Sequence, residues 1–173
     1  MADEPTEIGG SGARRPDLEL PADGRQSQRA LDIAKGASRL LLAHGFARLS
    51  EVTLKSGRRA DLVAIDLKSE IWIVEIKSSV ADFRADAKWP DYRAYCDRFF
   101  FAVGPDFPLD ILPDEVGIIV ADRFGGELVR PAPEHKLAAA RRKTVTLLMA
   151  RVGALRLHAL ADPDIPLDGT VRE

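Results

Sequence analysis

The stretch that decides the fold is RADLVAIDLKSEIWIVEIK, residues 59–77. Two runs within it, 59–67 and 71–77, are rich in aliphatic and β-branched residues, and a short polar connection separates them. Such runs predict β-strands, and the short connection folds the first back on the second. FARLSEVTL at 46–54 has the alternation of a strand and is followed by a Lys-Ser-Gly turn, so the three runs together predict an antiparallel meander.

Apolar periodicity predicts three helices outside the meander, over 25–44, 80–95 and 134–160. Three further strands are predicted at 98–103, 116–121 and 127–130. Pro90 requires a break in the second helix, because proline removes a helical hydrogen bond. This order of elements predicts an α/β fold in which helices flank a mixed β-sheet.

The net charge of −2 is unevenly distributed along the 173 residues. Residues 1–23 carry a charge of −4 and residues 161–173 a charge of −3, so the segment 24–160 carries +5. We interpret 1–23 and 161–173 as flexible acidic tails around one domain at 24–160, because they are rich in acids, Gly and Pro. The whole positive excess of the domain lies in 134–160, where nucleic acid is the expected partner.

The lone Cys96 excludes an intrachain disulfide and a cysteine-based zinc site. No apolar run in the sequence approaches the roughly 20 residues that span a bilayer, and the N-terminal residues do not have the pattern of a signal peptide. We therefore expect a cytoplasmic, nucleoid-associated protein without a membrane partner.

Acidic residues interrupt strands that otherwise read as core. Asp61 shares a face with Val63 in the second predicted strand, and Glu75 and Lys77 share a face at the end of the third. Pairing of the two strands can bring Asp61 toward Glu75. Two neighbouring carboxylates favour a hard divalent cation such as Mg²⁺ or Mn²⁺, with the backbone carbonyl of Ile76 as a further ligand. A lysine beside them can orient a water molecule or stabilise charge on a phosphate, which is the chemistry of phosphodiester hydrolysis.

The order of elements, with Asp61 and then Glu75-Ile76-Lys77, resembles the restriction-endonuclease-like core of the PD-(D/E)xK nuclease superfamily. The stretch 58–103 is more closely similar to the MmcB family of bacterial DNA-repair proteins, and a looser likeness extends over about 25–160. The resemblance implies a DNA-repair role and makes Asp61, Glu75 and Lys77 the expected active-site positions. Ala60 stands where the superfamily name has proline, and no acidic residue is evident on the inner face of the first helix.

We therefore expect a metal-dependent DNA endonuclease of DNA repair. The alternatives are a catalytically inactive DNA-binding or scaffold protein that recruits repair partners, and an RNA-directed hydrolase on the same fold. Many small nucleases of this fold cut as dimers, so a homodimer is compatible with the resemblance.

Residues around the predicted site have two readings each. Glu51 adds a metal ligand if its strand ends at the same place, and is otherwise an ordinary strand residue. Ser78 and Ser79 are better helix caps than phosphate ligands. Trp89 and Tyr92 are better packing residues than platforms for unpaired bases. The basic residues expected to contact DNA are Lys88, Arg141, Arg142 and Lys143.

Overall fold

The computed structural model describes residues 27–164. The tail predicted at 1–23 lies outside these residues, and so does the second tail beyond residue 164. The α-helices are α1 (Gln28–Ala43), α2 (Val80–Ala85) and α3 (Ala139–Ala161). The strands are β1 (Ala47–Thr53), β2 (Arg59–Ile65), β3 (Ile71–Lys77), β4 (Arg98–Val103), β5 (Gly117–Ala121) and β6 (Gly126–Arg130). Two 3-10 helices are η1 (Trp89–Tyr95) and η2 (Leu109–Ile111).

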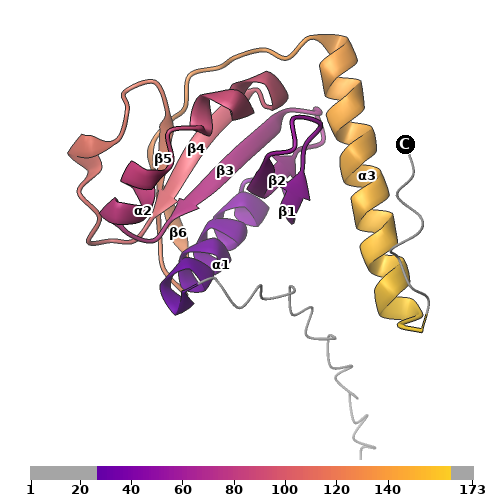
Figure 1. The fold of residues 1–173 in the computed structure, drawn as a ribbon, viewed down its shortest axis with the longest axis horizontal. Helices are drawn as coiled ribbons and strands as arrows, with labels where there is room; N and C mark the ends of the chain where they lie inside the picture. The colour runs from indigo at the N-terminus through magenta and orange to yellow at the C-terminus, as the bar shows by residue number, and fades with distance from the viewer. Residues whose placement is uncertain (1–26, 165–173) are drawn as a thin grey trace, which may run out of the picture.

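The six strands form one mixed sheet whose order, β1-β2-β3-β4-β5-β6, is the order of the chain. The pairs β1–β2 and β2–β3 are antiparallel, which confirms the predicted meander. The pairs β3–β4 and β4–β5 are parallel, and β6 returns antiparallel to β5. The predicted mixed α/β sheet flanked by helices is therefore present among the described residues (Figure 1).

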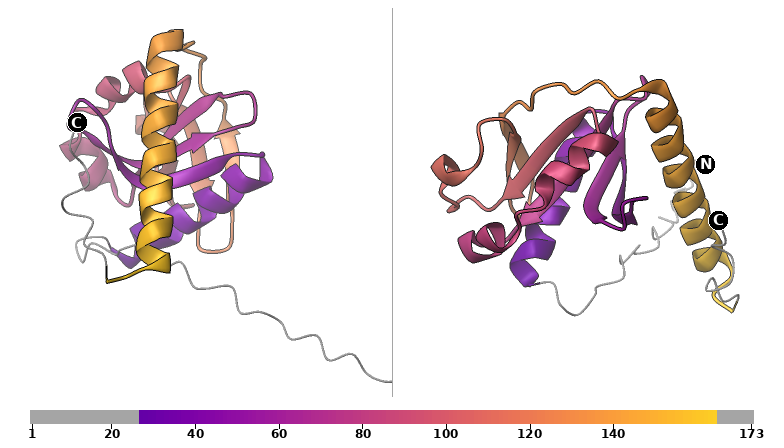
Figure 2. Two further views of the ribbon diagram at one scale, coloured as in Figure 1. Left: turned by 90° about the vertical axis from the view of Figure 1, so that its right-hand side faces the viewer. Right: turned by 45° about the horizontal axis from the view of Figure 1, so that its top comes forward.

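Two apolar clusters cover the two faces of the sheet. On one face, Ile33, Ala37 and Leu41 of α1 pack on residues of the central strands such as Phe100 and Ile119. On the other face, residues of α2, η1 and α3 pack on Ile73, Phe99 and Phe101. Figure 2 shows α3 running across the strands at the β1 side of the molecule. The site residues Glu75 and Lys77 lie on the same face of β3 as Ile73, beneath α2 and η1.

The ends of α1 follow from its sequence. The Ser27 side chain caps the helix by accepting a hydrogen bond from the Ala30 backbone N–H (3.2 Å). Gly45 follows the helix with φ of +82°, a conformation that glycine adopts at least cost. Gly36 brings the helix into close contact with the β5–β6 turn, where a Cβ would lie 2.1 Å from the carbonyl oxygen of Asp122. This contact seats α1 on the sheet.

The segment predicted as one helix over 80–95 is broken, as Pro90 requires. α2 ends at Ala85, and η1 begins at Trp89 with the proline in its first turn. The last helix begins at Ala139, five residues later than predicted. The preceding residues are held instead by Asp97, which fixes the path of the chain into α3.

Asp97 joins three parts of the chain. Its buried carboxylate accepts hydrogen bonds from the backbone N–H groups of Ile71 (2.8 Å) and Leu137 (3.0 Å). The same carboxylate forms a two-pronged ion pair with the Arg142 guanidinium at 2.6 and 2.7 Å. Burial opposes ionisation of Asp97, but the hydrogen bond from Arg142 outweighs it and lowers the pKa of the carboxyl. Asp97 therefore ties the start of β3 to α3.

Of the described residues, α3 alone is long and apolar enough to cross a membrane by length and composition. About 11% of its most apolar window is buried in the protein. A single helix of this kind is weak evidence for membrane insertion. Leu147, Leu157 and Leu160 are exposed on its surface.

We predict that Asp97→Ala lowers the free energy of unfolding by about 3 kcal/mol or more, because it leaves Arg142 and two backbone N–H groups without their buried partner. Urea denaturation of the purified chain measures the change. The matched control is Asp91→Ala, which removes an exposed carboxylate paired with Arg58 and should cost less than about 1 kcal/mol. Equal losses in the two variants would contradict the role given to Asp97.

Candidate active site

The predicted acids Asp61 and Glu75 meet where the β2–β3 ladder ends. The ladder stops at the pair Leu62 and Val74, and continuing its register places Asp61 opposite Glu75. Beyond this pair, side-chain carboxylates take the place of backbone carbonyls as hydrogen-bond acceptors. The Glu75 Oε1 atom accepts from the Asp61 backbone N–H (3.1 Å), and the Asp61 Oδ2 atom accepts from the Ile76 backbone N–H (2.7 Å). This reciprocal arrangement fixes the acidic pair at the end of the hairpin.

Glu51 lies next to the pair on β1, the first strand of the meander. β1 pairs with β2 through Ser50 and Val52, so the register places Glu51 opposite Asp61. The backbone of Glu51 has φ of 49°, which is uncommon for a residue with a side chain. Its carboxylate lies 3.9 Å from the Arg59 guanidinium, and its charge contributes to raising the pKa of Asp61. Three acids on adjacent strands are therefore at one level of the sheet.

Burial and mutual repulsion favour protonation of the acidic pair. The Glu75 residue is only 4% exposed, and burial followed by the charge of Asp61 raises the pKa of Glu75 to about 9. Burial also raises the pKa of Asp61. With no cation bound, the pair therefore retains a proton at neutral pH.

Lys77 is directed to a partner that the sequence did not single out. Its Nζ atom donates to the Asp86 Oδ2 atom at 2.6 Å and lies 5.9 Å from the centre of the Phe101 ring. Burial opposes the charge of Lys77, but Asp86 outweighs this effect and raises the pKa of the ammonium group, with a further contribution from Glu75. The lysine is therefore held charged beside the acidic pair. Asp86 stands just after α2, at the break that Pro90 predicted. An acidic residue just before a predicted helix break is the sequence signal that could have identified this partner of Lys77.

The aromatic residues of η1 close the site from one side. Tyr92 is buried and donates from its hydroxyl to the Arg59 carbonyl (2.9 Å). Burial and the charge of Glu75 raise the pKa of the Tyr92 phenol, so it stays a hydrogen-bond donor. Trp89 stacks on Phe99 with ring centres 5.5 Å apart. Both residues pack in the core, which confirms the packing interpretation.

The serines after β3 also behave as predicted. The Ser79 side chain caps α2 by accepting from the Asp82 backbone N–H (3.1 Å). Ser78 donates its backbone N–H to the Asp82 carboxylate (3.1 Å). These contacts fix the first turn of α2 directly beyond Lys77.

The four basic residues predicted to contact DNA have different environments. Lys88 is exposed, and its backbone N–H donates to the Asp86 carboxylate (3.0 Å). The Arg141 guanidinium lies 4.7 Å from the centre of the Tyr95 ring, and Arg142 is engaged by Asp97. Lys143 is exposed on α3. The structure thus gives Arg142 a structural contact, and DNA binding by these four residues stays a prediction.

The donor set of the pair matches Mg²⁺, which takes one or two carboxylates and completes its shell with water and substrate oxygens. One oxygen of each carboxylate accepts a backbone N–H, Glu75 Oε1 from Asp61 and Asp61 Oδ2 from Ile76. Within residues 27–164, no group of three or more His, Cys, Asp or Glu side chains gathers as a metal site. Glu51 is therefore near the pair without completing a three-carboxylate cluster.

The fold and site together define an α/β protein with a partly buried acidic pair at the end of an antiparallel hairpin. A family model described as "DNA repair protein MmcB-like" matches residues 18–164. The chain belongs to this MmcB-like family, which indicates a role in DNA repair. The search of curated proteins gives no match.

A solved structure supports the same fold. It is a protein of unknown function from Silicibacter pomeroyi, with 45% sequence identity and a TM-score of 0.78. The alignment covers 82% of this chain and 98% of that chain. The likeness therefore extends over most of this chain.

We predict that the metal-free protein loses stability as pH rises from about 4.5 to about 9, the range between the ordinary and the raised pKa of Glu75. The sign follows because a group with a raised folded-state pKa stabilises the fold while protonated, and this stabilisation disappears as it ionises. Unfolding by urea in the presence of EDTA measures the dependence.

Glu75→Gln keeps a neutral side chain at every pH, so the same curve should be flatter in this variant. Glu127→Gln, an exposed change on β6, is the control and should leave the wild-type slope unchanged. A wild-type slope that persists in Glu75→Gln would contradict the assignment.

Proposed function

We propose that the protein is a metal-dependent DNA phosphodiesterase of DNA repair, with a PD-(D/E)xK type of site. The observation that carries the proposal is the reciprocal pairing of Asp61 and Glu75 beside a charged Lys77. A bound Mg²⁺ or Mn²⁺ would supply an activated water and stabilise charge on the phosphate.

The residues of the chain divide this work between them. Asp61 and Glu75 would hold the cation, with the Ile76 carbonyl as the proposed further ligand. Lys77 presents a positive charge for the phosphate, and Asp86 fixes its position. Lys88 adds an exposed positive charge at the same corner, where a DNA backbone would approach.

The burial of the acidic pair has a consequence for such a reaction. Glu75 and Lys77 are each only 4% exposed, so substrate must reach them through a local opening of α2 or η1. The lysine would exchange Asp86 for a phosphate oxygen during this opening. Because α2 has only six residues and no buried side chain, it is the element most easily displaced.

The second candidate is a non-catalytic DNA-binding or scaffold protein of the same repair family. The Lys77–Asp86 ion pair favours it, because the lysine is already satisfied within the chain at 2.6 Å. In this reading the acids hold the end of the hairpin together through the two backbone N–H groups and perform no chemistry.

Cleavage assays separate the two candidates. We predict that the full chain with Mg²⁺ or Mn²⁺ cuts linear, forked or junction DNA, and that Glu75→Gln lowers the rate on the order of 100-fold or more. Glu127→Gln is the matched control and should cut at the wild-type rate. No cutting of any substrate, or cutting that survives Glu75→Gln, would rule out hydrolysis at this site.

Metal binding is measured independently of cutting. Mn²⁺ should raise the melting temperature of the wild-type chain and of Glu127→Gln, but not that of Glu75→Gln, because binding to the folded state alone stabilises it. The scaffold candidate would be supported if the protein binds DNA, does not cut it, and shows no shift of its melting temperature with Mn²⁺.

A further inference from the structure

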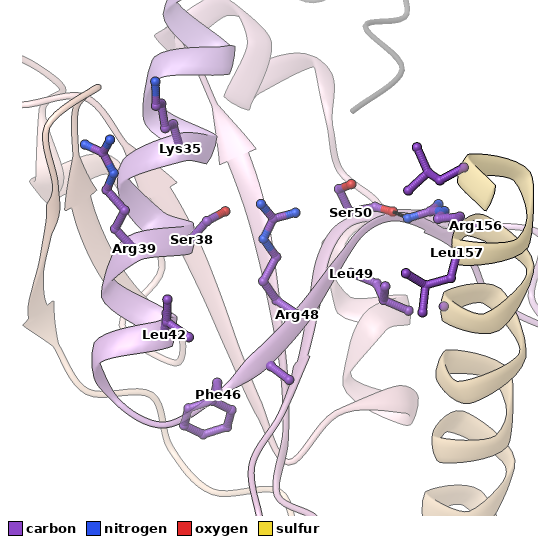
Figure 3. A pocket seen from close by; sticks show the side chains of 13 residues that line it. Lys35, Ser38, Arg39, Leu42, Phe46, Arg48, Leu49, Ser50, Arg156 and Leu157 are labelled. Carbon is purple, nitrogen blue, oxygen red and sulfur yellow. Dashed lines mark hydrogen bonds between the residues drawn. The ribbon is translucent and has the colours of Figure 1, made fainter. Parts of the chain in front are cut away.

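A groove of about 610 Å³ lies between α1, β1 and α3, at the β1 edge of the sheet. Its lining differs from that of the acidic pair, because none of the residues that line the groove is acidic. Its apolar side chains come from all three elements and include Leu42 of α1, Leu49 of β1 and Leu157 of α3. Figure 3 shows Leu49 and Leu157 pointing toward each other across the groove.

The apolar part of the groove is open to solvent. Leu42 is 73% exposed, Leu157 is 66% exposed and Leu160 is 55% exposed. Three exposed leucines around one concave surface mark it as an interaction site, because isolated exposed leucines are ordinary but grouped ones are not.

The rim of the groove is basic. Its charged side chains are Lys35, Arg39, Arg48 and Arg156. Arg39 donates to the carbonyls of Arg123 and Phe124, and Arg156 donates to those of Ser50 and Glu51. These carbonyl partners position the guanidinium groups without neutralising their charge.

Arg48 is the residue of the groove that most clearly indicates binding of an anion. It is half-buried between α1 and α3 (Figure 3), and within residues 27–164 its guanidinium group has neither a hydrogen bond nor an ion pair. Burial and the nearby Arg156 guanidinium lower the pKa of Arg48. Two neighbouring arginines repel each other, so a carboxylate between them would remove a cost that the free protein bears.

We propose that this groove is a docking site for an acidic amphipathic segment of a partner protein. Leucine-type side chains of the segment would cover Leu42, Leu49 and Leu157, and its carboxylates would pair with Arg48 and Arg156. Helices that dock in this way use an apolar face for affinity and flanking charges for orientation.

Two other occupants fit this surface less well. A second copy docking through α3 would bring like charges together, since α3 carries five Lys and Arg residues and no acid. Nucleic acid would match the rim, but the aliphatic floor offers Phe46 as its aromatic residue, which is a poor platform for bases.

The test uses the full chain and a labelled peptide of about 16 residues, with leucines at i, i+3, i+4 and i+7 and glutamates on the remaining face. Fluorescence anisotropy should show binding that weakens at least about tenfold in Arg48→Glu and in Leu157→Asp. Absence of peptide binding by the wild-type chain would overturn the proposal.

Two control variants separate docking from general charge and hydrophobicity. Lys143→Glu changes an exposed base of α3 outside the groove, and Leu67→Asp changes a fully exposed leucine between β2 and β3. Both should bind the peptide as the wild type does. Losses as large as those of the groove variants would overturn the proposal.

Two further measurements address folding and the alternative occupants. Arg48→Gln removes the charge without reversing it, and should weaken binding while leaving the melting temperature at or above that of the wild type, because the Arg48 guanidinium has no ion-pair partner among residues 27–164. Duplex DNA, vesicles containing phosphatidylserine and sedimentation of the chain alone form the other arms. If the groove variants impair one of these and leave peptide binding intact, the groove has that occupant and the proposal is wrong.

Discussion

The buried ion pair between Asp97 and Arg142 is the interaction on which the rest of the molecule depends. α3 places only Val145 and Met149 fully in the core, so its apolar contacts alone are few for a helix of 23 residues. Asp97 adds a charged anchor at the N-terminal end of the helix and, with the same carboxylate, fixes the first residue of β3 and the segment before α3. The position of α3 determines one wall of the basic groove. A single buried carboxylate thereby connects the start of the site strand to the outer surface.

The acidic pair and Asp97 use the same physical device at different places. In each case a carboxylate accepts a backbone N–H that the sheet ladder leaves without a strand partner. Asp97 is compensated by an arginine, and its pKa is lowered. Glu75 faces Asp61 instead, and its pKa is raised. The first arrangement stabilises the fold as an ion pair, whereas the second holds two repelling carboxylates together.

Much of this architecture could be predicted from local patterns. β3 and β4 have the predicted limits, and the proximity of Asp61 and Glu75 follows from alternation along two strands joined by a short turn. The parallel pairing of β4 with both neighbours, and the partners of Asp97 and Lys77, could not be predicted, because periodicity reports which side of an element is buried but not what lies opposite. Arg142 is 45 residues from Asp97. The same limit hid the groove, whose lining comes from segments separated by more than 100 residues of chain.

The order of the sheet has a consequence for how the protein forms. Every strand pairs with the one that precedes it in the chain, so each new pairing closes a short loop and the entropic cost of each step is small. The sheet can therefore grow strand by strand as the polypeptide leaves the ribosome. The carboxylate of Asp97 pairs with Arg142, 45 residues further along the chain, so this contact closes a longer loop than the turns within the sheet.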